Sequence, residues 1–110
     1  MRGGLLARRL ALGLVAGLAA CGPTYEEGMM AQGRLHCELL EACDALADVG
    51  YDSVGACITD AEGQNFGDCP GDAYRADNMA ACVEAWEAAV AATECDASPV
   101  ECMPAQVCPR

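Results

Sequence analysis

The sequence predicts an all-α fold, a small disulfide-stapled three-helix domain with an irregular C-terminal strap. Apolar residues recur at helical spacing in three segments. Alanine, which favours helices, is abundant, and the β-branched residues that favour strands are few, so a β-sheet is not expected. Nine cysteines in 110 residues can form the disulfide bonds that stabilise such a domain. A short chain needs them, because below roughly 70–80 residues a single core rarely supplies more than a few kcal/mol.

The first predicted helix covers residues 29–48. Its acidic residues lie on one side and its apolar positions on the other, as in an amphipathic helix; the apolar positions include Leu35, Leu39, Cys43 and Leu46. Residues 22–28 are expected to form a polar tether before this helix. Gly22-Pro23-Thr24 discourages a helix there, and nothing in the segment is periodic.

A second, shorter helix is expected at residues 53–62. It follows a turn at residues 49–52, and the hydroxyl of Ser53 can cap its first turn. Gly63 can end it, and the glycines and proline of residues 63–71 then predict a loop.

The third predicted helix covers residues 73–94, with Asp72 as its N-terminal cap. Trp86 lies on its apolar stripe and is expected in the core. The tail from Asp96 carries three prolines, so it is expected to be an extended strap held by its cysteines.

Helix geometry narrows the possible disulfides. Cys82 and Cys95 lie about 20 Å apart along one helix, well beyond the ~7 Å that a disulfide allows between Cα atoms, and Cys37 and Cys43 lie on different faces. Cys43 and Cys57 stand at similar distances from the turn between the first two helices, as a hairpin bridge requires. A third helix parallel to the first would bring Cys37 level with Cys82. The predicted pairs are Cys43 with Cys57, Cys37 with Cys82, Cys95 with Cys102, and Cys69 with Cys108.

Residues 1–20 have the layout of a signal peptide. The first nine residues hold three arginines and no acid, and an uninterrupted run of apolar and small residues follows from Leu10 to Ala20. This run is shorter than the ~20 residues that a membrane-spanning helix needs. Arg8-Arg9 lacks the preceding serine or threonine of a twin-arginine signal, so the general secretory route is preferred.

The run ends in Leu18-Ala19-Ala20-Cys21, which resembles the lipobox of bacterial lipoproteins. The resemblance implies cleavage before Cys21, transfer of a diacylglycerol to its thiol and, usually, acylation of the freed amine. The alternative is cleavage by ordinary signal peptidase, with Cys21 as a leftover thiol. The cysteine count favours lipidation, because the other eight cysteines can then all pair.

Two or three acyl chains anchor a protein more firmly than the marginal binding of one chain, so a lipid bilayer is the first expected partner. Residue 22 is glycine, not the aspartate that retains enterobacterial lipoproteins at the inner membrane, and this resemblance points to the outer membrane. The expected organisation is a signal peptide at 1–20, a lipidated tether at 21–28 and a cysteine-rich helical domain at 29–110.

The charge of the mature part limits its partners. All 17 acidic residues follow position 21, where three arginines and no lysine remain, so the side-chain charge is −14 with His36 neutral. Such a field repels polyanions, which argues against nucleic acid and anionic headgroups and favours cations or a basic envelope protein. The simpler interpretation of the same charge is solubility.

No group of residues amounts to an active site, so no catalytic residue, metal ligand or cofactor is predicted. His36 is the only histidine, and no Cys-x-x-Cys motif occurs, which argues against nucleophilic pairs, redox pairs and zinc sites. Two i, i+3 carboxylate pairs could hold a weakly bound calcium ion, although the EF-hand pattern is absent; they are Glu38 with Glu41 and Glu84 with Glu87.

Three segments together carry a family resemblance: Cys37-Glu38-Leu39-Leu40-Glu41-Ala42-Cys43, Val54-Gly55-Ala56-Cys57 and Ala80-Ala81-Cys82-Val83. With them the mature part resembles the small cysteine-rich lipoproteins of myxobacteria and related high-GC Gram-negative bacteria. The resemblance implies a surface or periplasmic location and a helical, disulfide-bonded build, and it carries over no activity. The sequence predicts a membrane-anchored acidic envelope protein that is not an enzyme. A binding or structural role ranks first, calcium or cation binding second, and a small hydrolytic enzyme last.

Overall fold

The computed structural model describes residues 22–109. The predicted all-α class is confirmed, since this part of the chain contains no strand and has three main helices, α2 (Tyr25–Ala42), α3 (Val54–Glu62) and α4 (Ala76–Ala92). Three short helical turns complete it: η1 (Ala47–Val49), η2 (Val100–Cys102) and α5 (Pro104–Val107). The predicted signal peptide and Cys21 lie outside the described residues. Within residues 22–109, no helix has the length and apolar character needed to cross a membrane.

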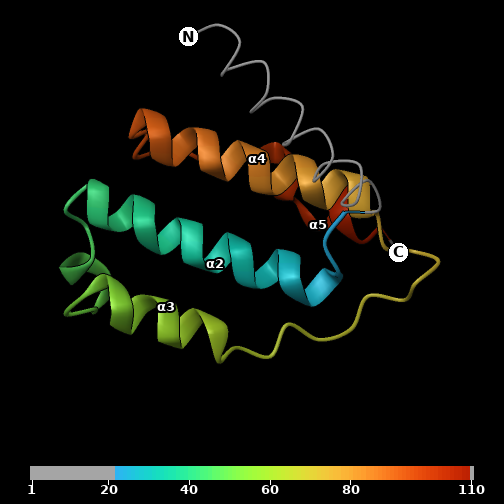
Figure 1. Cartoon of the computed structure of the whole chain (residues 1–110), viewed down its shortest axis with the longest axis horizontal. Helices are drawn as coiled ribbons and strands as arrows, with labels where there is room; N and C mark the ends of the chain where they lie inside the picture. The colour runs from blue at the N-terminus through green and yellow to red at the C-terminus, as the bar shows by residue number, and fades with distance from the viewer. Residues whose placement is uncertain (1–21, 110) are drawn as a thin grey trace, which may run out of the picture.

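The three main helices lie side by side in one layer, with α2 in the middle (Figure 1). Helix α2 packs against both neighbours, whereas α3 and α4 make no contact with each other. Helix α4 runs in the same direction as α2, and α3 runs in the opposite direction (Figure 1). The hydrophobic core lies between α2, α4 and the C-terminal segment, where Met79, Cys82 and Val107 are buried.

Helix α2 begins four residues earlier than predicted, so residues 25–28 are helix and not tether. Thr24 forms a capping box: its Oγ1 accepts from the Glu27 amide at 3.1 Å, and Glu27 Oε1 accepts from the Thr24 amide at 2.9 Å. Pro23 does not interfere, because it precedes the cap. The hydrogen bond that the Thr24 amide donates to the Glu27 carboxylate lowers the pKa of Glu27 below its ordinary 4.5, and the interaction of the Thr24 hydroxyl with the carboxylate is the second cause.

Helix α2 also ends earlier than predicted, at Ala42 instead of residue 48. Asp44 has a left-handed backbone, and η1 fills part of the segment that was expected to be helical. The second helix closely matches the prediction. The Ser53 hydroxyl accepts from the Ala56 amide at 3.0 Å, and Gly63 is the C-cap.

Helix α4 begins at Ala76, three residues later than predicted, and Asp72 does not cap it. Residues 70–74 form a turn instead, in which the Tyr74 amide donates to the Pro70 carbonyl at 2.9 Å. The helix ends at Ala92, with Thr93 as a left-handed cap.

The C-terminal segment is not the extended strap that was expected, because η2 and α5 fold it into a compact cap against α4. Pro104 occupies the start of α5, where a missing amide hydrogen costs nothing. The Arg75 amide donates to the Val107 carbonyl at 3.0 Å, and Asn78 Nδ2 donates to the Gln106 carbonyl at 2.7 Å. These bonds hold α5 against the start of α4.

Four disulfides join Cys37 with Cys57, Cys43 with Cys95, Cys69 with Cys108, and Cys82 with Cys102. The predicted pair of Cys69 with Cys108 is present. The pairing of Cys43 with Cys57 was wrong, because α2 ends at Ala42. The connection between α2 and α3 is therefore longer than predicted, and α3 lies at a different position along α2. Cys37 then lies opposite Cys57, while Cys43 caps the end of α2 and reaches Cys95 just beyond α4.

The pairing of Cys37 with Cys82 was also wrong, although α4 is parallel to α2 as that pairing requires. Gly28 of α2 lies against Met79 of α4, and Cys43 at the end of α2 is bonded to Cys95 just beyond α4. Each residue of α4 therefore lies opposite the α2 residue whose number is lower by 51 or 52. Cys82 therefore lies opposite residue 30 or 31, about 10 Å along the helix axis from Cys37. It bonds Cys102 of the C-terminal cap, which excludes the predicted pair of Cys95 with Cys102.

Candidate binding groove

Two glycines on α2 let its neighbours approach closely. A Cβ atom at Gly28 would lie 2.3 Å from Met79 Cγ on α4, and one at Gly33 would lie 2.8 Å from Ala61 Cβ on α3. Because α3 and α4 then flank α2 without meeting, part of α2 stays uncovered between them.

A groove of about 470 Å³ runs along this uncovered part of α2, which we call the α2 groove. Met29, Gly33, His36 and Leu40, spaced three or four residues apart, line it from α2. Ala61 and the disulfide of Cys37 with Cys57 line its α3 side. Val49, which is 52 % exposed, and Phe66 extend it at either end of α3. The lining is therefore mainly apolar, in the size range of about 300–1,000 Å³ that ligand sites occupy.

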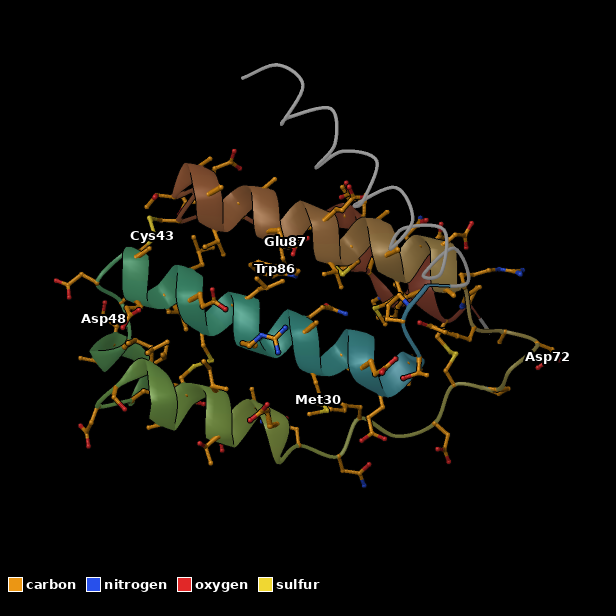
Figure 2. The ribbon with its side chains drawn as sticks, in the orientation of Figure 1. Met30, Cys43, Asp48, Asp72, Trp86 and Glu87 are labelled. Carbon is orange, nitrogen blue, oxygen red and sulfur yellow. A yellow bond between two sulfur atoms is a disulfide. The ribbon has the colours of Figure 1, made fainter. Side chains whose placement is uncertain are left out.

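Trp86 forms the α4 wall of the groove and lies between α2 and α4 (Figure 2). It was predicted in the core, and it is partly buried against the core while one side lines the groove. The exposed His36 ring lies 5.3 Å from the Trp86 ring. The buried indole Nε1 donates no hydrogen bond to any described residue.

Asp60 supplies the one carboxylate among the described residues of the groove lining. Its Oδ2 accepts a hydrogen bond from the Tyr51 hydroxyl at 2.6 Å, and this bond is the main cause that raises the pKa of Tyr51. Both side chains lie at the α3 edge of the groove, so a ligand would meet a negative charge beside an apolar floor.

A second hollow, of about 440 Å³, lies between the start of α2 and the C-terminal cap. We call it the cap pocket. Tyr25 and Met29 line it from α2, and Pro104, Ala105 and Val107 line it from α5. None of the described residues that line it carries a charge. The Tyr25 ring is held by an edge-on contact with Tyr74, with ring centroids 5.8 Å apart.

The other residues considered from sequence do not form a site. Glu41, Glu84 and Glu87 are exposed and Glu38 is partly exposed, and no group of three metal-ligating side chains comes together within residues 22–109. The hydroxyl of Ser53 is engaged in capping α3. No sequence motif marks the α2 groove, because the groove arises from the layered arrangement of the helices.

Comparison with known proteins gives no relative: no protein-family model matches the chain, and no curated protein or solved structure is significantly similar to it.

Proposed function

We propose that this chain is a lipid-anchored, acidic protein of the bacterial outer membrane that binds a basic envelope protein through the α2 groove. The anchor part of the proposal rests on the Leu18-Ala19-Ala20-Cys21 sequence. The four disulfides support an exported protein, since structural disulfides persist in oxidising compartments. The binding part rests on the groove.

The observation that carries the binding role is the uncovered apolar stripe of α2. A helix in the middle of a layer normally buries its apolar positions, but here Leu40 and Met29 remain partly exposed beside the aromatic Trp86. Concave apolar surfaces with a few polar groups at the edge are the usual form of binding sites. Trp and Met are also enriched at protein interfaces.

Charge supports a basic partner. The described part carries all 17 acidic residues and only two arginines, and Asp60 stands at the groove edge. A partner that offers an apolar side chain to the groove and a lysine or arginine to Asp60 would match both features, and the long-range field would speed its association.

The two other roles have less support. Calcium binding would depend on the pairs Glu38 with Glu41 and Glu84 with Glu87. All four side chains are exposed or partly exposed, and isolated surface carboxylates hold calcium weakly. A hydrolase of the Ser-His or Cys-His type would need its nucleophile and histidine in contact, and the one histidine, His36, contacts Trp86 instead.

Two exposed valines give a matched test of the groove. Val49 lines it and Val100, 63 % exposed on η2, does not. The tagged chain is crosslinked in intact cells of its host and purified in mild detergent. A captured protein of net positive charge should fall about ten-fold in yield with Val49→Lys, because a cation then faces the basic partner in the groove, and should persist with Val100→Lys.

In a parallel purification without crosslinking, the partner should dissociate between low and moderate salt, as expected for an electrostatically steered complex. Capture that is equally insensitive to both substitutions would contradict the groove as the binding site. Capture only of acidic proteins would contradict the partner chemistry.

A further inference from the structure

The cap pocket has a composition unlike the rest of this acidic molecule. Tyr25, Met29, Ala105 and Val107 form its apolar lining, and the described lining residues include no charged side chain. Its volume of about 440 Å³ falls within the usual range of ligand sites. An uncharged hollow of this size in a domain with 17 carboxylates favours a ligand that is itself uncharged and apolar.

The pocket lies at the end of the molecule where the described chain begins. Gly22 packs against Ala76 at the start of α4, closely enough that a Cβ atom there would lie 2.5 Å from the Ala76 carbonyl oxygen. The Tyr74 hydroxyl donates to the Pro23 carbonyl oxygen. These contacts fix the path of residues 22–24 and place Gly22, the first described residue, at the end of the molecule where α2 and α4 begin (Figure 1).

The covalent chain limits the distance between the proposed lipidation site and the pocket. Cys21 is four residues from Tyr25, which lines the pocket, and four residues span at most about 14 Å. An acyl chain is about 15 Å long, half of the ~30 Å hydrocarbon core that two opposed chains fill. A chain attached at Cys21 can thus reach the pocket and lie along it.

We propose that the cap pocket binds one acyl chain of the lipid on Cys21. This inference depends on the lipid anchor of the proposed function and goes beyond it. The chain covers the apolar surfaces of Tyr25, Val107 and Pro104, and the covalent link gives it a high effective concentration at the pocket. The remaining acyl chains enter the bilayer and keep the protein anchored.

One consequence is a fixed orientation. With an acyl chain seated between α2 and α5, the start of α2 and the C-terminal cap face the membrane. The opposite end, with Cys43 and Asp48, then points away from it (Figure 2).

The proposal is tested with acyl chains that carry a photoreactive diazirine. Cells that produce the full chain are fed the modified fatty acid, and the purified lipidated protein is placed at low density in unlabelled phosphatidylcholine vesicles and illuminated. Intact mass measured first establishes whether Cys21 is acylated. Crosslinked peptides should then map to residues 25–29 and 102–109.

Two exposed alanines provide matched variants, Ala105→Glu in the pocket and Ala88→Glu on α4 away from it. Ala105→Glu should lower the crosslinks to the pocket at least five-fold, because a charge excludes the acyl chain, and Ala88→Glu should leave them unchanged. Circular dichroism of both variants checks that the helices are retained.

Each other outcome overturns the inference in a recognisable way. A mass without acyl chains refutes the lipid anchor and the inference together. An acylated protein whose crosslinks go only to phospholipid refutes the inference alone, and so do crosslinks that join a ¹⁵N-labelled copy to an unlabelled one, since the occupant is then a neighbour's chain.

Discussion

At the scale of single residues, the absence of a side chain at Gly28 shapes the packing of the core. The position is buried, and Met79, which is fully buried, occupies the space that a Cβ atom would take. No sequence pattern indicates this role. A glycine leaves no apolar signal in a periodicity pattern, and Gly28 fell in the predicted tether. Only the arrangement of α2 against α4 reveals it.

Gly28→Ala is expected to destabilise the protein by about 1–3 kcal/mol, the usual cost of overpacking a core. Alanine is the better helix former by about 1 kcal/mol, but the Met79 side chain, 0 % exposed, has no free space into which to move. Chemical denaturation with the disulfides intact measures the change.

Gly55→Ala on α3 is the matched control. Its Cβ atom would meet only the Ser53 hydroxyl oxygen at 3.8 Å, so helix propensity alone should act and stability should rise by up to about 1 kcal/mol. Equal effects of the two substitutions would show that Gly28 is not constrained by Met79.

At the scale of elements, the interiors of the helices could be predicted from sequence, whereas their ends could not. The apolar spacing of Leu35 and Leu39 places both residues in the buried face of α2, as expected. The start of α2 was missed because Gly22-Pro23 indicated a tether, although Thr24-x-x-Glu27 has the pattern of a capping box. Its end was missed because Leu46 continues the apolar pattern beyond the last helical turn.

Thr24→Ala is expected to cost about 0.5–2 kcal/mol, since the amide of Glu27 loses its hydrogen-bond acceptor at the start of α2. Thr59→Ala, an exposed change inside α3, should cost much less. Denaturation midpoints of the two variants compare them directly, and a Thr24→Ala protein as stable as the parent would exclude a role for the cap.

The Glu27 side of the capping box predicts a pH effect. Its pKa is lower in the folded chain than its ordinary 4.5, so the carboxylate stabilises the fold above that pH and loses this effect as the pH falls through the folded pKa. In the Glu27→Gln variant, the free energy of unfolding should therefore fall less steeply as the pH is lowered below 4.5. The neighbouring change Glu26→Gln should reduce this slope less; the reverse order would contradict the capping assignment.

At the scale of the whole molecule, the all-α class and the use of eight cysteines as staples could be predicted, but most of their pairing could not. Pairing depends on the relative shift of neighbouring helices, and errors of a few residues at the ends of α2 moved Cys43 and Cys37 to different partners. Cys69 and Cys108 were predicted correctly because both lie outside the long helices, near the start of α4.

The disulfides link each outer helix, or its end, to α2. The bond of Cys37 with Cys57 holds α3 to one side of α2, and that of Cys43 with Cys95 holds the end of α4 to the other. No disulfide among the described cysteines joins α3 directly to α4. The groove between them therefore depends on this connectivity.

Peptide mapping without reduction tests this architecture most directly. Proteolysis of the native chain should release four linked pairs: Cys37 with Cys57, Cys43 with Cys95, Cys69 with Cys108, and Cys82 with Cys102. A peptide that joins Cys43 to Cys57, or Cys37 to Cys82, would require a different shift of α3 or α4 along α2 and would contradict the single open layer on which the α2 groove depends.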